Sequence, residues 1–172
     1  MHDAAPIQAF PDHAHDHASC VAEALATAER ICNERGVRLT ALRRRVLELV
    51  WNSHQPVGAY DLLGELARGG RRAAPPTVYR ALQFLLDQGL VHRIESRNAF
   101  IGCAHPEDRH VVEIMLCSQC GRAAELPDDR IASAVRAAAK RLGFEVQRQT
   151  IEVTGLCAEC RTAPAGAAAE RS

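Results

Sequence analysis

Two Cys-x-x-Cys pairs limit what this chain can fold into more than any other feature of its sequence. Cys117 and Cys120 form the first pair, Cys157 and Cys160 form the second, and 36 residues separate them. Two residues between thiolates let both sulfurs face one metal ion at ~2.3 Å, and two such turns complete a closed tetrahedron. The spacing therefore predicts a structural zinc site with four cysteine ligands. An iron–sulfur site or a redox pair is the alternative.

The size and composition of the chain are those of a globular protein that stays out of the membrane. It has 172 residues, 47% apolar and 24% charged, which suits one ordinary domain or two small ones. No apolar run approaches the roughly 18–20 residues that span a bilayer, and the acidic start lacks the basic-then-apolar pattern of a secretory signal. We therefore expect a cytoplasmic location, where seven cysteines indicate metal binding or redox chemistry rather than disulfides.

Charge is unevenly distributed along the chain, although the formal net charge is zero. Residues 1–29 carry five acids and no Arg or Lys, whereas residues 30–97 carry twelve Arg against six acids. A segment of about +6 inside a neutral chain is the expected footprint of contact with nucleic-acid phosphates. A solvated, Arg-rich surface without a ligand is the alternative interpretation.

The basic segment has the pattern of several short helices followed by a β-hairpin. Thr40 is placed to cap one helix, Gly58 to begin another, and Pro76 and Gly89 to begin and end the last. An earlier helix is expected from Val21 to Arg35, and two strand-like runs meet around residues 96–98. This order predicts a winged helix-turn-helix over residues 20–102, whose last helix would enter the DNA major groove.

A second, smaller α/β domain is expected over residues 103–162. Strand-like "HVVEIMLC" and "GRAAEL" precede a helix from about Asp129 to Leu142, and "FEVQRQTIEVTGL" is expected to form a closing strand. Ile131, Val135 and Leu142 mark one face of this helix, and Phe144, Val146, Ile151 and Val153 are expected to be buried in the strand. A region of ~60 residues has a small core and usually needs a metal or a partner subunit. Residues 1–19 and 163–172 are expected to be disordered tails.

A second group of possible metal ligands precedes and follows the first cysteine pair: His92, Cys103, His105, His110 and Glu125. Taken singly, each has an ordinary structural explanation, and Cys103 could simply be a small apolar residue at a strand end. Together they offer nitrogen, sulfur and oxygen donors. A mixed-donor site should exchange metal more easily than four thiolates do, and its thiolate favours zinc over Fe²⁺ or Mn²⁺. Those are the properties of a metal sensor.

Specific motifs in the chain resemble those of the ferric uptake regulator family. They are "RLTALRRRVLELV", "PPTVYRALQFLLDQGLVHRIES", "LCSQCG" and "GLCAEC", and the resemblance covers about Ala22 to Cys160. Ala41 departs from the proline usual in the family, and the His-rich run common in iron-sensing members is absent. The chain looks most like the zinc-sensing branch. This resemblance implies a homodimer with two zinc ions per subunit, the regulatory ion being held by His92, Cys103, His110 and Glu125.

The expected function is that of a zinc-responsive transcriptional repressor, which binds operator DNA as a dimer when zinc-loaded and controls zinc-uptake genes. We expect no enzymatic activity. The alternatives are a sibling sensor of iron, manganese, nickel or peroxide, a DNA-binding protein with only structural zinc, a zinc-containing thiol redox enzyme and a zinc hydrolase. The candidate DNA contacts are Thr77, Tyr79, Arg80, Tyr60, Arg38, Arg43, Arg44 and Arg45.

Overall fold

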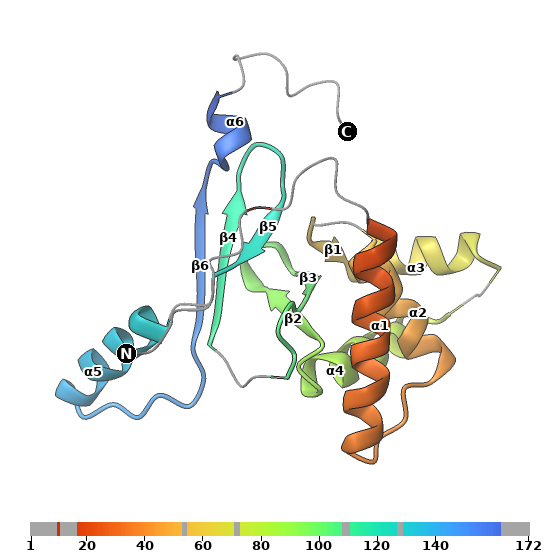
Figure 1. Ribbon diagram of the computed structural model, residues 1–172, viewed down its shortest axis with the longest axis horizontal. Helices are drawn as coiled ribbons and strands as arrows, with labels where there is room; N and C mark the ends of the chain where they lie inside the picture. Colours follow the sequence, from red (N-terminus) through yellow and green to blue (C-terminus); the bar gives the residue numbers. More distant parts are fainter. Residues whose placement is uncertain are drawn as a thin grey trace. The chain divides into compact units, whose positions relative to one another are not determined.

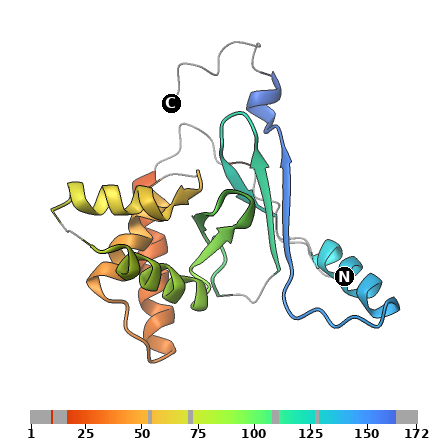
Figure 2. The same ribbon diagram turned by 180° about the vertical axis from the view of Figure 1, so that it is seen from behind.

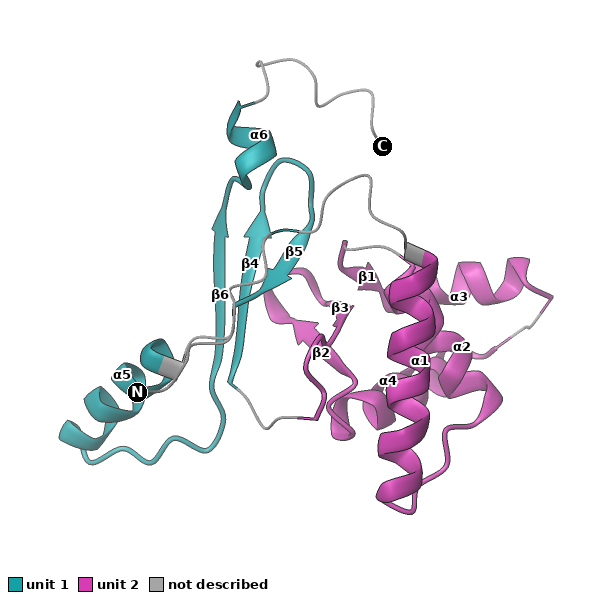
Figure 3. Ribbon diagram, in the orientation of Figure 1, with its two compact units in different colours: residues 1–11, 109–172 teal, residues 12–108 magenta. Residues whose placement is uncertain are grey.

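The chain forms two compact units in the computed structural model (Figure 3). Unit 2 comprises residues 12–108, and unit 1 comprises residues 1–11 and 109–172. The structure describes residues 10, 17–52, 55–70, 73–107, 111–126 and 129–162. Among these residues, no helix is both long and apolar enough to cross a membrane.

Four helices make up most of unit 2 (Figure 1). As expected, the Thr40 side chain caps the second helix by accepting a hydrogen bond from the Arg43 backbone N–H at 3.4 Å. Gly89 adopts a φ of 68° just after the fourth helix, a left-handed conformation that suits glycine. The helices are α1 (His17–Glu34), α2 (Ala41–Trp51), α3 (Ala59–Arg68) and α4 (Pro75–Asp87).

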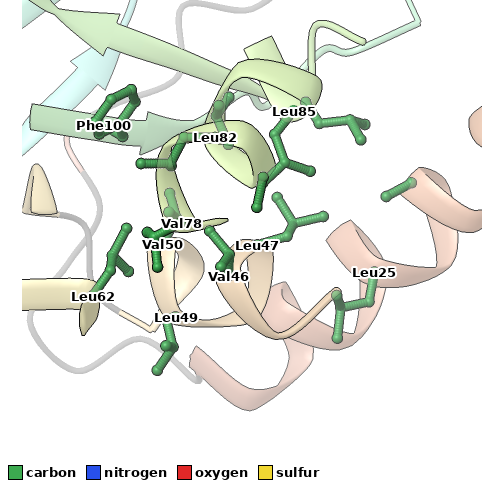
Figure 4. Packing of buried hydrophobic residues seen from close by; sticks show 14 of the residues in the cluster. Leu25, Val46, Leu47, Leu49, Val50, Leu62, Val78, Leu82, Leu85 and Phe100 are labelled. Atoms are coloured by element: carbon green, nitrogen blue, oxygen red, sulfur yellow. The ribbon is translucent and has the colours of Figure 1, made fainter. Parts of the chain in front are cut away.

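The apolar faces of these helices meet in one core (Figure 4). Val46 and Val50 of α2 are buried with Leu82 and Leu85 of α4, and Leu62 of α3 joins them. Burying side chains of this size contributes ~1.5–3 kcal/mol each. The core therefore fixes α4, the predicted recognition helix, against the rest of unit 2.

A small antiparallel sheet completes the winged helix in unit 2. Its strand order is β1 (Val57–Gly58), β3 (Ala99–Gly102), β2 (Val91–Ile94). The hairpin between β2 and β3 turns through a 3₁₀ segment, Glu95–Arg97, and through Asn98 at a φ of 46°. The predicted hairpin is thus present, whereas the two-residue β1 was not predicted.

Gly102 at the end of β3 allows a close approach of the Trp51 ring. A Cβ atom built on Gly102 would lie 2.2 Å from Trp51 Cε2 and 2.4 Å from Nε1. We therefore expect Gly102→Ala to displace the indole and lower the free energy of unfolding by about 1–3 kcal/mol, as overpacking does. Urea unfolding followed by the fluorescence of Trp51, the single tryptophan, would measure this loss. Gly155→Ala is the control, because nothing lies within 4 Å of its added Cβ; equal stability of the two variants would contradict the prediction.

Unit 1 contains a second three-stranded sheet with the order β5-β4-β6. β4 (Val112–Cys117) pairs antiparallel with β5 (Ala123–Glu125) and parallel with β6 (Thr150–Gly155). Figures 1 and 2 show β6 beside β4 over its length, with the short α6 (Ala158–Thr162) following it. The helix α5 (Asp129–Arg141) connects β5 to β6, and Gly143 ends it at a φ of 68°.

Several expected boundaries differ from the structure. α1 begins at His17, so residues 17–19 belong to a helix rather than to a tail. The boundary between the units along the chain falls between residues 108 and 109, not between 102 and 103. Residues 103–107 belong to unit 2 because the Cys103 backbone N–H donates to Leu90 O at 3.1 Å and Glu107 pairs with Arg30. The tails predicted at 1–16 and 163–172, apart from residue 10, lie outside the described residues.

The closing strand of unit 1 was predicted too long and too buried. β6 begins only at Thr150, and Phe144 lies outside it. Ile131, Val135, Phe144 and Val153 are all exposed in the single chain, whereas Ala132 provides the buried face of α5. Their spacing along the sequence is typical of buried residues, but within the single chain these side chains lie on the surface.

Candidate metal centres and DNA-binding surface

The structure brings the four predicted cysteine ligands together. The Sγ atoms of Cys117, Cys120, Cys157 and Cys160 all lie within 4.8 Å of one another. The Cys120 and Cys157 sulfurs are 3.9 Å apart. Sulfurs at ~2.3 Å from a tetrahedral zinc ion would be separated by about 3.8 Å, so the cluster has the size of a zinc–tetrathiolate site.

Local backbone structure places the first pair at the end of β4. The Gly121 N–H donates to Cys117 O at 3.1 Å, and the Cys117 N–H donates to Arg122 O at 2.9 Å. Gly121 has a φ of 75°, which permits the tight turn. This turn presents the sulfurs of Cys117 and Cys120 on one side.

The second pair reaches the first through the parallel pairing of β4 with β6. Cys117 is in register with Gly155, and the Ser118 N–H donates to Gly155 O at 2.8 Å. Cys157 follows two residues later and precedes α6, which contains Cys160. The sheet register thus places the second pair beside the first, although 36 residues separate them in sequence.

Hydrogen bonding prepares one of these thiols to act as a ligand. Burial raises the pKa of Cys117, but backbone hydrogen bonds from Cys120, Cys157 and Gln119 outweigh burial and lower the pKa to about 6. Burial and hydrogen bonds with the other cysteine side chains raise the pKa of Cys160 to about 12. Four adjacent thiolates repel one another, so a divalent cation is needed before all four can deprotonate. Four protein ligands leave no open position, which is characteristic of structural rather than catalytic zinc.

Sequence reasoning missed two charged residues beside this cluster, Arg122 and Glu159. The Arg122 guanidinium donates to the Cys120 and Cys157 sulfurs and pairs with the Glu159 carboxylate. Burial lowers the pKa of Arg122, but the hydrogen bonds with Cys120 and Glu159 raise it above its ordinary value. The available signal was positional: Arg122 follows the first pair by two residues, and Glu159 lies inside the second.

Two of the predicted regulatory ligands lie together in unit 2. His92 is in β2, Cys103 follows β3, and their ligand atoms lie within 4.8 Å of each other. His92 is 8% exposed and Cys103 is 3% exposed. A buried imidazole beside a buried thiol can bind a soft or borderline metal ion. The partly exposed His105 comes two residues after Cys103.

The other two predicted ligands are elsewhere in the sequence. Glu125 ends β5 in unit 1, where it is in register with Ile114. His110 lies outside the described residues. The four-residue regulatory site therefore remains a prediction.

The predicted DNA-contacting residues of α4 are on its exposed face. Thr77, Tyr79 and Arg80 are exposed, whereas Val78 and Ala81 face the core. Tyr79 is 42% exposed, which argues against a purely packing role. Tyr60 on α3 is 75% exposed.

The arginines proposed to contact phosphates differ in their surroundings. Arg43 donates to Arg38 O at 2.6 Å, and its guanidinium carbon lies 3.6 Å from the centre of the Phe84 ring. Arg44 pairs with Glu29, and Arg45 pairs with Glu48 at 2.8 Å. Exposed pairs of this kind are worth only ~0–1 kcal/mol, so phosphates can replace the carboxylates. Arg38 and Arg80 form no ion pair with another described residue.

Comparison with known proteins finds matches that span both units of the chain. The model of the ferric uptake regulator family matches residues 34–154. The zinc uptake regulation protein of Escherichia coli K12 is 41% identical over 139 residues, covering 80% of this chain and 81% of that protein. A structure described as a zinc uptake regulator complexed with zinc and DNA has a TM-score of 0.78 and 40% identity, covering 82% of this chain and 95% of that chain. The crystal structure of holo XcZur has a TM-score of 0.75 and 48% identity, covering 81% and 97%.

Proposed function

Because this chain belongs to the ferric uptake regulator family, we propose that it is a zinc-responsive transcriptional repressor acting on operator DNA. It is a transcription regulator and not an enzyme. The observation that carries the choice of metal is the adjacent pair of His92 and Cys103 in the wing. The pair supplies a thiolate, a donor that suits zinc better than Fe²⁺ or Mn²⁺. Zinc and DNA are also the ligands of a relative with 40% identity.

Two zinc ions per subunit fit the donor groups. We assign the structural ion to Cys117, Cys120, Cys157 and Cys160, whose sulfurs have the spacing of a tetrahedral site. We assign the regulatory ion to His92, Cys103, His110 and Glu125. Two neutral imidazoles, one thiolate and one carboxylate balance the charge of Zn²⁺, whereas four thiolates leave a net charge of −2. The regulatory site is therefore the weaker and more readily exchanged of the two.

Metal ligation at the regulatory site would join the two units through their own residues. His92 and Cys103 belong to unit 2, and Glu125 belongs to unit 1. Holding all of them on one ion fixes the orientation of α4 relative to the partner subunit's α4. Because DNA half-sites are spaced by a helical turn, only one such orientation binds both. Converting a mostly inactive population into a mostly active one requires a preference of ~5 kcal/mol, which a site with several ligands can supply.

A homodimer is supported by the apolar surface of unit 1. Large apolar side chains remain exposed on α5, on β6 and in the segments after them. Their spacing along the sequence is nevertheless typical of buried residues. A second copy of the chain would cover them, as expected for a small unit with little core of its own. They are Ile131, Val135, Leu142, Phe144, Val153 and Leu156. We place the dimer in the cytoplasm, where it would repress zinc-uptake genes.

The proposal is tested by DNA binding at buffered free metal concentrations. Operator duplexes would be selected from random DNA with the full-length dimer, both with and without zinc, and affinity measured by fluorescence anisotropy. We expect removal of exchangeable zinc to weaken binding to the selected duplex by about 100-fold, a typical upper size for allosteric coupling. Iron or manganese should not restore it. Equal affinity without zinc would indicate a constitutive DNA-binding protein, and restoration by iron or manganese would indicate a sensor of that metal.

A further inference from the structure

The Arg122 side chain reaches both cysteine pairs at once. Its Nε–H donates to Cys120 Sγ at 3.4 Å, and its Nη2 donates to Cys157 Sγ at 3.6 Å. Arg122 is only 5% exposed. One guanidinium edge therefore contacts one sulfur from each Cys-x-x-Cys pair.

Glu159 holds this guanidinium in place from the other pair. Arg122 Nη2 lies 2.7 Å from Glu159 Oε2, and Nη1 lies 3.5 Å from Oε1. Two contacts between a planar guanidinium and a carboxylate fix the orientation of the guanidinium and of its N–H donors. Arg122 follows the first pair and Glu159 lies inside the second. Their ion pair therefore joins the same two segments, 36 residues apart in sequence, that the proposed zinc ion joins.

The charge of the site determines the direction of the effect. Four thiolates with Zn²⁺ carry a net charge of −2. A fixed positive charge that donates hydrogen bonds to two of the sulfurs therefore stabilises the zinc-loaded form more than a neutral side chain in its place would. Arginine remains charged at any physiological pH, so it supplies this charge permanently. Arg122, Cys117 and Cys157 are buried, so the attraction is screened less than at the surface.

We propose that Arg122, oriented by Glu159, is a positioning residue of the four-cysteine site that offsets its negative charge and so strengthens zinc retention. The inference rests on the proposed binding of structural zinc. Partners that hydrogen-bond to metal ligands typically contribute 10–100-fold to metal affinity. Arg122 thus makes the structural ion harder to remove than the four cysteines alone would. The difference in zinc affinity between the structural and the regulatory site becomes larger as a result.

The test uses the full-length, zinc-loaded chain and three substitutions. Arg122→Gln removes the charge, Arg122→Lys keeps the charge without the forked geometry, and Glu159→Gln removes the orienting carboxylate. Arg136→Gln is the matched control, because Arg136 is an exposed arginine of the same unit that contacts Ser133 rather than a cysteine. Each chain is titrated with a chelator while native mass spectrometry counts the bound zinc ions and alkylation mapping identifies the protected cysteines.

We expect Arg122→Gln to release the four-cysteine zinc at about 10–100-fold lower chelator strength than the wild type. Arg122→Lys should lie between them, Glu159→Gln should shift less in the same direction, and Arg136→Gln should match the wild type. Co²⁺ in the same site provides a second measurement. Loss of N–H donation makes the thiolates more electron-rich, so the sulfur-to-cobalt charge-transfer band of Arg122→Gln should move to lower energy.

Three results overturn the inference. Wild-type zinc retention and an unshifted cobalt band in folded Arg122→Gln would reduce Arg122 to a salt-bridge partner of Glu159. If Arg122→Gln does not fold, unchanged zinc retention in Glu159→Gln decides against the orienting role, since Glu159 is 43% exposed and its loss disturbs little packing. If all four cysteines of the folded wild type are alkylated without delay, the structural zinc site itself is wrong. That last result is distinct from the others because it concerns the unmodified chain.

Discussion

Replacing Cys103 with serine is expected to abolish the zinc response of DNA binding while leaving the four-cysteine site loaded. Serine has nearly the same shape, but its hydroxyl does not deprotonate at neutral pH and is a poor zinc ligand. His92 would lose its adjacent soft donor, which lies within 4.8 Å in the wing. At saturating zinc, we expect the variant to bind operator about 100-fold more weakly than the wild type, at the level of the zinc-depleted protein.

The measurement combines metal counting with DNA binding. Native mass spectrometry should find two zinc ions per wild-type subunit and one in Cys103→Ser. Cys20→Ser is the matched control, because it makes the same chemical change in α1, far in sequence from the proposed ligands. A Cys103→Ser protein that still responds to zinc like the wild type would mean that Cys103 is only a buried residue at a strand end.

The features of the fold that were predictable are those fixed by neighbouring residues. Thr40 caps α2 through a bond to a residue three positions away, and Gly89 ends α4 through its own backbone conformation. Pro76 likewise lies in the first turn of α4, where its missing N–H costs no helical hydrogen bond. Each of these signals is local, so a single sequence contains it in full.

The features that were missed depend on residues distant in sequence. β1 is a strand only because Val57 pairs with Phe100, and neither residue alone indicates this. The apolar residues of α5 and β6 show a core-like pattern, yet Ile131, Val135 and Val153 are exposed, because periodicity cannot distinguish a core from an interface between subunits.

The candidate site shows the same division. The spacing of each Cys-x-x-Cys pair was sufficient to predict one ion with four ligands, and the structure places the four sulfurs together. The contact of Arg122 with Glu159 was not predictable, because charged residues near metal ligands are common and only the β4–β6 register brings these two together.

Replacing Cys157 with serine is expected to have the largest structural effect, unfolding most of unit 1. Apparent binding energies of structural zinc are on the order of 10–16 kcal/mol, which exceeds the stability of many whole domains. The sheet of unit 1 has three strands, and its buried side chains are few. With one ligand lost, the remaining thiolates bind zinc too weakly to offset the entropy of ordering this unit.

Unit 2 should survive this change, because its core is formed by its own helices together with Leu90, Val91 and Phe100. In the full-length chain, we therefore expect Cys157→Ser to lose strand signal in circular dichroism and to become sensitive to protease after residue 108, with a protected fragment corresponding to unit 2. Sedimentation should show a monomer, because the apolar surface proposed to join two copies belongs to unit 1. Removing zinc from the wild type with a strong chelator should have the same effect.

The control and the contradicting result are both defined by what zinc is proposed to do. Cys20→Ser should remain folded and dimeric, which excludes a general effect of losing a thiol. A Cys157→Ser chain that keeps its sheet and its dimer would show that unit 1 does not depend on metal for its stability. In that case the β4–β6 register alone would bring the two cysteine pairs close together. Zinc would then bind to a unit that is already folded and would not be needed for the fold.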